Sequence, residues 1–256
     1  MNTATRASIY AVVVGAIFVG IYYLATNVVL FPNYDAYASA WNPITAIILA
    51  VIGLVAGVAW GSRGELSDWK TVDVILTANL AVVFGLLFLG WAFVWDAVAF
   101  LNTLLPGLRD LFYGFWFIAA IVAPYIVRRP GAALAAETLA ALAELLAGGE
   151  WGLTLLISGL VQGGLAEVVF AGTGYKRYDL LTLMIAGAAA GVGSLVVDRV
   201  FWYPDLTLGV LGVMLVARII SGALLSGWLG KWLVDAIADA GALNSFAIGQ
   251  ESRELV

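Results

Sequence analysis

The chain has 256 residues, of which 63% are hydrophobic and only 11% are charged, whereas soluble domains carry roughly a quarter charged residues. It contains neither cysteine nor histidine, which excludes disulfides, thiolate chemistry, haem ligation and histidine-centred metal sites or catalytic triads. Its formal net charge of −5 argues against a basic nucleic-acid-binding face. These values indicate an integral membrane protein with no nucleic-acid partner and no cofactor.

Apolar segments recur along the whole chain, and a membrane-spanning helix needs about 20 such residues. No polar block as large as a soluble domain interrupts them, so the sequence predicts an all-α polytopic protein of about eight transmembrane helices. The most polar internal linker, GSRGELSDWK at residues 61–70, separates two extra N-terminal helices within residues 1–64 from a block of six. The spans are expected at 7–31, 43–61, 72–94, 110–127, 131–147, 152–171, 179–201 and 207–234.

The basic residues indicate the orientation, because cytoplasmic segments of membrane proteins are enriched in Lys and Arg. With the N-terminus in the cytoplasm, most basic residues fall on cytoplasmic segments, and Arg218 lies within the last span. This pattern predicts a multi-pass protein of the cytoplasmic membrane with both termini in the cytoplasm. The cytoplasmic set is Arg6, Arg63, Lys70, Arg128, Arg129, Lys176, Arg177, Lys231 and Arg253, and the outer set is Arg109 and Arg199.

Two glutamates lie inside the fifth expected span. Glu137 and Glu144 are seven residues apart and therefore share one face of a helix. Counted from Pro130 on the cytoplasmic side, they lie about 10 Å and about 21 Å deep. A carboxylate in hydrocarbon costs several kcal/mol, so such residues usually face a cavity, a partner charge or a ligand.

Aromatic and amide groups lie toward the outer side of the same spans. Carboxylates, amides and flat rings suit a small, cationic, aromatic ligand, because rings stack on rings and a positive heterocycle gains from π-faces and carboxylates. Helix-end aromatics also serve as anchors at the membrane interface, which is the alternative for each of them. The candidate binding residues are Glu137, Glu144, Gln162, Trp116, Trp151 and Tyr203.

Two further charged residues have a structural interpretation. Arg218, near mid-membrane, could neutralise Glu137 or Glu167 as an ion pair. Glu167 lies toward the cytoplasmic end, near Lys176 and Arg177, which also favours a structural role. Gln162 and Ser158 are one turn apart and could form interhelical hydrogen bonds instead of contacting a ligand.

Several blocks resemble the YkoE-type thiamine/hydroxymethylpyrimidine-binding S components of energy-coupling factor (ECF) transporters. The clearest is YGFWFIAAIVAPYIVRRPGAALAAETLAALAELLAGGEWG at residues 113–152, followed by LISGLVQGGLAEVVF at 156–170. Further blocks are LLTLMIAGAAAGVGSLVVD, VARIISGALLSGWLGK and GALNSFAIGQE. The likeness spans residues 69–251, which are therefore expected to form a six-helix S-component domain, and leaves residues 1–64 outside.

The resemblance implies capture of thiamine or its hydroxymethylpyrimidine precursor in an outward-facing pocket for ATP-driven uptake. It implies partners as well: a transmembrane coupling subunit and two ABC-type ATPases. No GxxxxGK[ST] motif occurs in the chain, so ATP hydrolysis is expected on other subunits and the chain is not expected to be an enzyme. The residues that match polar positions of the family are Glu137, Glu144, Gln162 and Glu167, with Trp116 and Asp198.

The resemblance also suggests where the coupling subunit docks. S components commonly use a strip of small residues on the first helix of this domain. Thr77, Ala81 and Gly85 recur every four residues there and are the predicted contact.

Two rival functions remain from the residues alone. A carboxylate proton relay would give pH-driven flux without an ATPase partner, and a structural assembly subunit would tolerate exchange of Glu137 and Glu144 for glutamine. A membrane-embedded enzyme is less consistent with the chain, which has neither a GxSxG nor a DDxxD-type motif.

Overall fold

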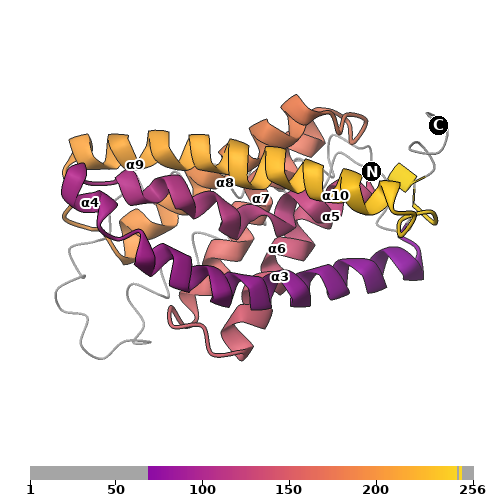
Figure 1. Cartoon of the computed structure of the whole chain (residues 1–256), viewed down its shortest axis with the longest axis horizontal. Helices are drawn as coiled ribbons and strands as arrows, with labels where there is room; N and C mark the ends of the chain where they lie inside the picture. Colours follow the sequence, from indigo (N-terminus) through magenta and orange to yellow (C-terminus); the bar gives the residue numbers. More distant parts are fainter. Residues whose placement is uncertain (1–68, 247, 250–256) are drawn as a thin grey trace, which may run out of the picture. The chain divides into compact units, whose positions relative to one another are not determined.

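The computed structural model describes residues 69–246 and 248–249 (Figure 1). The two leading spans predicted within residues 1–64 lie outside this range. The described residues contain helices and short connections without any strand. Asp198–Asp205 belongs to a compact unit separate from the unit that holds the other described residues.

All six helices predicted after residue 70 are present, close to their expected bounds, and the all-α fold class is confirmed for the described residues. Five segments are long and apolar enough to cross a membrane, and the shorter α6 is not among them. The elements are α3 (Thr71–Ala97), α4 (Leu101–Leu104), η4 (Leu108–Phe117), α5 (Ala119–Val127), α6 (Ala132–Leu146), α7 (Thr154–Gly172), α8 (Leu180–Phe201), α9 (Leu208–Ser221), η5 (Gly222–Trp228) and α10 (Leu229–Asp239).

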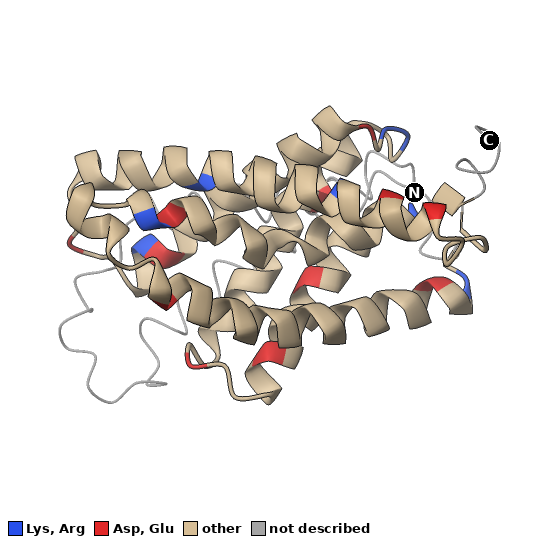
Figure 2. Cartoon of the chain, viewed as in Figure 1, with Lys and Arg blue, Asp and Glu red and all other residues tan. Residues whose placement is uncertain are grey.

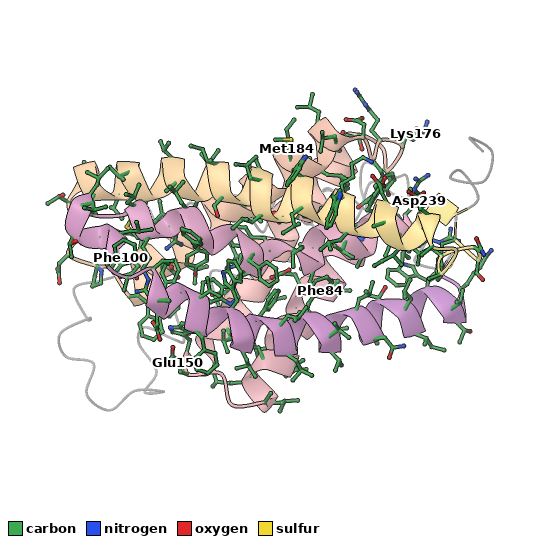
Figure 3. The ribbon with its side chains drawn as sticks, viewed as in Figure 1. Phe84, Phe100, Glu150, Lys176, Met184 and Asp239 are labelled. Carbon is green, nitrogen blue, oxygen red and sulfur yellow. The ribbon has the colours of Figure 1, made fainter. Side chains whose placement is uncertain are left out.

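The long helix α3 shows how the chain meets the bilayer. Its only charged residues, Asp73 and Asp96, lie near its two ends, so its middle carries no charge in Figure 2. Apolar side chains on one side are about half exposed, as expected for a lipid-facing surface, whereas Phe84 points from α3 into the bundle and is 7% exposed (Figure 3). The exposed set includes Val74, Ile75, Val82, Val83, Leu86 and Leu87.

Helix α6 packs closely against two neighbouring helices. Its 15 residues span about 22 Å, less than the roughly 30 Å of a hydrocarbon core. Glycines allow close approach on two sides: a Cβ at Gly85 of α3 would lie 2.5 Å from the Ala140 carbonyl oxygen, and one at Gly163 of α7 would lie 2.8 Å from the Glu137 Cβ. The helix that carries both central glutamates is therefore held inside the bundle.

Two irregular helices were not expected from the sequence. The span 108–127 begins as the ten-residue 3₁₀-helix η4, and the run from α9 to α10 is interrupted by the π-helical segment η5. η4 meets the junction of α9 and η5, where a Cβ on Gly114 would collide with the backbone of Ser221, the last residue of α9, and of Gly222, the first residue of η5. The Ser221 hydroxyl also accepts a hydrogen bond from the Gly114 N–H at 2.7 Å. Close packing at a glycine thus fixes how these two segments meet.

Candidate functional site

A cluster of aromatic rings joins α3, η4 and the loop after α6. The Trp95, Tyr113 and Trp116 rings are mutually edge-on, with centroids 5.2–5.4 Å apart. Trp151 adds a fourth ring, edge-on to Trp116 at 5.5 Å. We call these four residues the aromatic cluster. Aromatic side chains grouped in this way can bind flat heterocycles by stacking.

Within the aromatic cluster, Trp116 has an unused hydrogen-bond donor. The residue is 8% exposed, and its indole Nε1 is buried without a hydrogen-bond partner among the described residues. A buried tryptophan N–H normally finds a partner, because leaving it unmade costs about 1–3 kcal/mol. Such a group marks a place where a ligand can supply the missing acceptor.

Glu144 supplies the complementary group. Its side chain is 2% exposed, and its Oε1 has no hydrogen-bond partner among the described residues. Its backbone carbonyl accepts a hydrogen bond from the Gly149 N–H at 2.9 Å, at the start of the loop that continues to Trp151. Glu150, labelled in Figure 3, marks this loop. The α6–α7 loop therefore leads along the chain from the end of α6, where Glu144 has an oxygen without a partner among the described residues, to Trp151 of the aromatic cluster.

Glu137 has a different environment, although it shares a helix face with Glu144. It is 1% exposed, and its Oε2 accepts a hydrogen bond from the Ala120 N–H at 2.9 Å, in the first turn of α5. One of its oxygens is therefore engaged in joining α5 to α6. Of the two glutamates, Glu144 is the one left with an orphan acceptor.

Gln162 lies on α7, next to the Gly163 that packs against Glu137. The residue is buried, with 4% of its surface exposed. Tyr203 lies in the separate unit Asp198–Asp205. Its backbone carbonyl accepts a hydrogen bond from the Arg199 guanidinium at 2.6 Å. Its position relative to the aromatic cluster is therefore not described. The structure thus brings Trp116 and Trp151 into contact, and it places Glu144 at the end of α6, from which the loop to Trp151 begins.

The two residues interpreted as ion-pair candidates have partners that were not foreseen. Arg218 is fully buried and pairs with Asp110 of η4. Glu167 accepts hydrogen bonds from the backbone N–H groups of Gly131 and Ala133 at 2.6 and 3.0 Å, so it caps α6. Asp110 was not singled out from the sequence. The signal that could have found it is the three-residue spacing of Asp110, Tyr113 and Trp116, the period of a 3₁₀-helix.

The residues predicted to contact the coupling subunit lie on a face of α3 that packs within this chain. Thr77 and Ala81 are 2% and 0% exposed, and Gly85 packs on the Ala140 carbonyl of α6. Small residues allow close helix approach, and here they serve the α3–α6 packing inside this chain. The strip is covered by α6 in this structure, and its contact with a coupling subunit stays a prediction.

Comparisons with known proteins identify the family of this chain. The sequence model of a family described as "ABC-type cobalt transport system, permease component" matches residues 72–193. Among residues 69–246 and 248–249, no group of three or more acidic side chains could hold a metal ion. A Bacillus subtilis (strain 168) protein, described as the HMP/thiamine permease protein YkoE, is 38% identical over 190 residues, which are 74% of this chain and 94% of that protein.

A solved structure is similar as well. It is described as the crystal structure of an S-component of an ECF transporter, and it is 37% identical, with a TM-score of 0.68. The match covers 73% of this chain and 94% of that one. These relatives are transporter components and not enzymes. The chain therefore belongs to the YkoE-type family of S components, the substrate-binding membrane subunits of ECF transporters.

Proposed function

We propose that this S component binds thiamine or its hydroxymethylpyrimidine precursor and delivers it for ATP-driven uptake. The observation that carries the proposal is a pair of buried polar atoms without a partner among the described residues, Trp116 Nε1 in the aromatic cluster and Glu144 Oε1 on α6. The description of the B. subtilis relative as an HMP/thiamine permease gives the same ligand class.

The chemistry of an aminopyrimidine fits these two atoms. Its exocyclic amino group donates a hydrogen bond, which the Glu144 carboxylate can accept, and its ring nitrogens accept, which suits the Trp116 indole N–H. The flat ring gains by stacking against the aromatic cluster. A positive thiazolium, where present, gains further from π-faces and from the carboxylate. Gln162, which has both a donor and an acceptor, can complete the hydrogen-bond set.

The rest of the transport cycle requires partners. The chain has no nucleotide-binding GxxxxGK[ST] motif, so we assign ATP hydrolysis to two ABC-type ATPases. A transmembrane coupling subunit would transmit their conformational changes to this chain. We orient the end of the bundle that carries Lys70, Arg128 and Arg129 toward the cytoplasm, because cytoplasmic segments are enriched in basic residues. On this orientation, the aromatic cluster lies toward the outer side.

A calorimetric titration of the purified protein in nanodiscs tests the proposal. We expect saturable binding of thiamine or hydroxymethylpyrimidine, weakened by Glu144→Gln and by Trp116→Phe and unchanged by Lys176→Gln, since Lys176 is exposed and lies outside the α6–α7 loop. A wild-type protein that binds neither compound contradicts the proposal. Proton flux without an ATPase partner supports the relay instead.

A further inference from the structure

The 3₁₀-helix η4 presents three rows of side chains, because this helix has three residues per turn and side chains three apart lie in line. One row faces α3: the Phe112 carbonyl accepts the Trp91 indole N–H at 2.8 Å, and Phe115 stacks on the Trp91 ring at 4.3 Å. A second row meets the junction of α9 and η5 through Gly114 and Ser221. The third row consists of Asp110, Tyr113 and Trp116.

Continuous contacts tie the third row to one buried cation. Arg218 of α9 pairs with Asp110, and its guanidinium carbon lies 3.7 Å from the centre of the Tyr113 ring. Tyr113 is in turn edge-on to Trp116 at 5.2 Å. The chain of contacts therefore runs from the arginine through two turns of η4 to the unpartnered Trp116 indole N–H.

The winding of η4 decides where Trp116 points. Across the six residues from Asp110 to Trp116, a 3₁₀-helix completes two full turns, whereas an α-helix with 3.6 residues per turn would leave Trp116 about 120° away from Asp110. Runs of more than three or four residues of 3₁₀-helix are uncommon, since their hydrogen-bond geometry is poorer. The ten residues of η4 therefore require support from their surroundings.

We propose that Asp110 and Arg218 are positioning residues that hold η4 in its 3₁₀ winding, so that Trp116 directs its indole N–H toward the ligand. The pair touches no ligand itself. The effect of the Asp110–Arg218 pair on ligand affinity rests on the proposed function. Its effect on the environment of the Trp116 ring does not depend on that function. Arginine suits this task because its planar guanidinium can pair with a carboxylate and stack on an aromatic ring at the same time.

A double-mutant cycle tests the affinity effect. Arg218→Lys keeps the charge but loses the planar group, and we expect about tenfold weaker thiamine binding, the size of effect that is common for coupled neighbours. In the Trp116→Phe background the same change should have little further effect, because the group it positions is already gone. Asp110→Asn should behave in the same way. Equal losses in both backgrounds would indicate a general structural role and overturn the proposal.

Fluorine NMR of protein labelled with 5-fluorotryptophan tests the positioning without any ligand. Trp116→Phe assigns the resonance, and we expect Arg218→Lys and Asp110→Asn to shift or broaden it. The matched control is Asp235→Asn, because Asp235 likewise pairs with a cation, Lys231, and lies outside η4; it also accepts a hydrogen bond from the Tyr125 hydroxyl at 2.7 Å. That control should leave the resonance unchanged.

The two failures are distinguishable. A wild-type protein that binds no thiamine or hydroxymethylpyrimidine refutes the proposed function, and the fluorine resonance still decides whether the pair positions Trp116. A resonance that does not respond to either substitution refutes the positioning role, even where the protein binds thiamine.

Discussion

The Glu167 carboxylate on α7 accepts a hydrogen bond from the Gly131 N–H at 2.6 Å. A side chain of one helix thus caps the amino terminus of its neighbour, α6. Gly131 is the N-cap of α6, has a φ of 87° and has no side chain with which to cap the helix. A second bond reaches Ala133 at 3.0 Å, and the Tyr175 hydroxyl donates to the same carboxylate at 2.6 Å. The helix that carries Glu137 and Glu144 is thus anchored by an acid outside it.

Replacement of this acid should destabilise the fold. We expect Glu167→Ala to lower the free energy of unfolding by about 2–4 kcal/mol, because it leaves buried N–H groups of α6 without an acceptor. Glu167→Gln should cost less, since its amide oxygen still accepts. Thermal unfolding in detergent measures both, with the exposed Glu150→Gln as the control. Equal melting temperatures for Glu167→Ala and the wild type would contradict the capping role.

Substitution of the two central glutamates should affect different properties, ligand binding for Glu144 and stability of the fold for Glu137. Glu144→Gln is expected to weaken thiamine binding at least about tenfold, or about 1.4 kcal/mol, with little change in melting temperature, because its Oε1 has no partner among the described residues. Glu137→Ala is expected to lower the melting temperature, because the Ala120 N–H loses its acceptor. Calorimetric titration and thermal unfolding on the same samples give both quantities. The reverse pattern would show that the roles are exchanged.

Two glycines on α3 provide a matched test of the internal packing. Gly85→Ala should cost about 1–3 kcal/mol, because its Cβ would lie 2.5 Å from the Ala140 carbonyl and 2.9 Å from the Glu144 N. Gly90→Ala on the same helix should be neutral or stabilising by up to about 1 kcal/mol, because nothing lies within 4 Å of that Cβ and alanine favours helix. Thermal unfolding compares them. Similar effects at both positions would place Gly85 at a surface after all.

The loop before α8 should show a pH dependence. The Asp179 carboxylate accepts a hydrogen bond from the Thr182 N–H at 3.0 Å, and this bond, followed by the contact with Arg177, lowers the pKa of Asp179 below 3.8. A lowered pKa in the folded state adds stability above pH 3.8, which is lost as the pH falls through the folded pKa. Asp179→Asn should therefore have a lower melting temperature near neutral pH and match the wild type in strong acid. A constant difference at every pH would contradict this.

The helices themselves could be predicted from the sequence. Apolar segments long enough to span a membrane must form helices, because every backbone polar group in lipid needs a hydrogen-bond partner within the segment. Glu137 and Glu144 could also be identified, since carboxylates inside such segments are too costly to be incidental. The family blocks added the ligand class, and the comparisons confirm the family.

The partners of the buried charges depended on tertiary structure. Arg218 and Asp110 are 108 residues apart, and nothing local shows that α9 and η4 meet there. Glu167 could equally have paired with a nearby cation, but the chain places it against the amino end of α6. The strip at Thr77 and Ala81 was assigned to the outside, because small residues favour close contact without revealing which helix makes it.

The sequence by itself determined that this chain crosses a membrane, where its helices run and which acids are exceptional within them, because composition and periodicity fix these properties residue by residue. Only the tertiary structure decided that Glu144 keeps an unpaired oxygen while Glu137 bonds to Ala120, and that Trp116 directs an unpartnered N–H beside three other rings. The physical reason is that a buried polar group is satisfied or orphaned by its neighbours in space, and those neighbours come from distant parts of the chain.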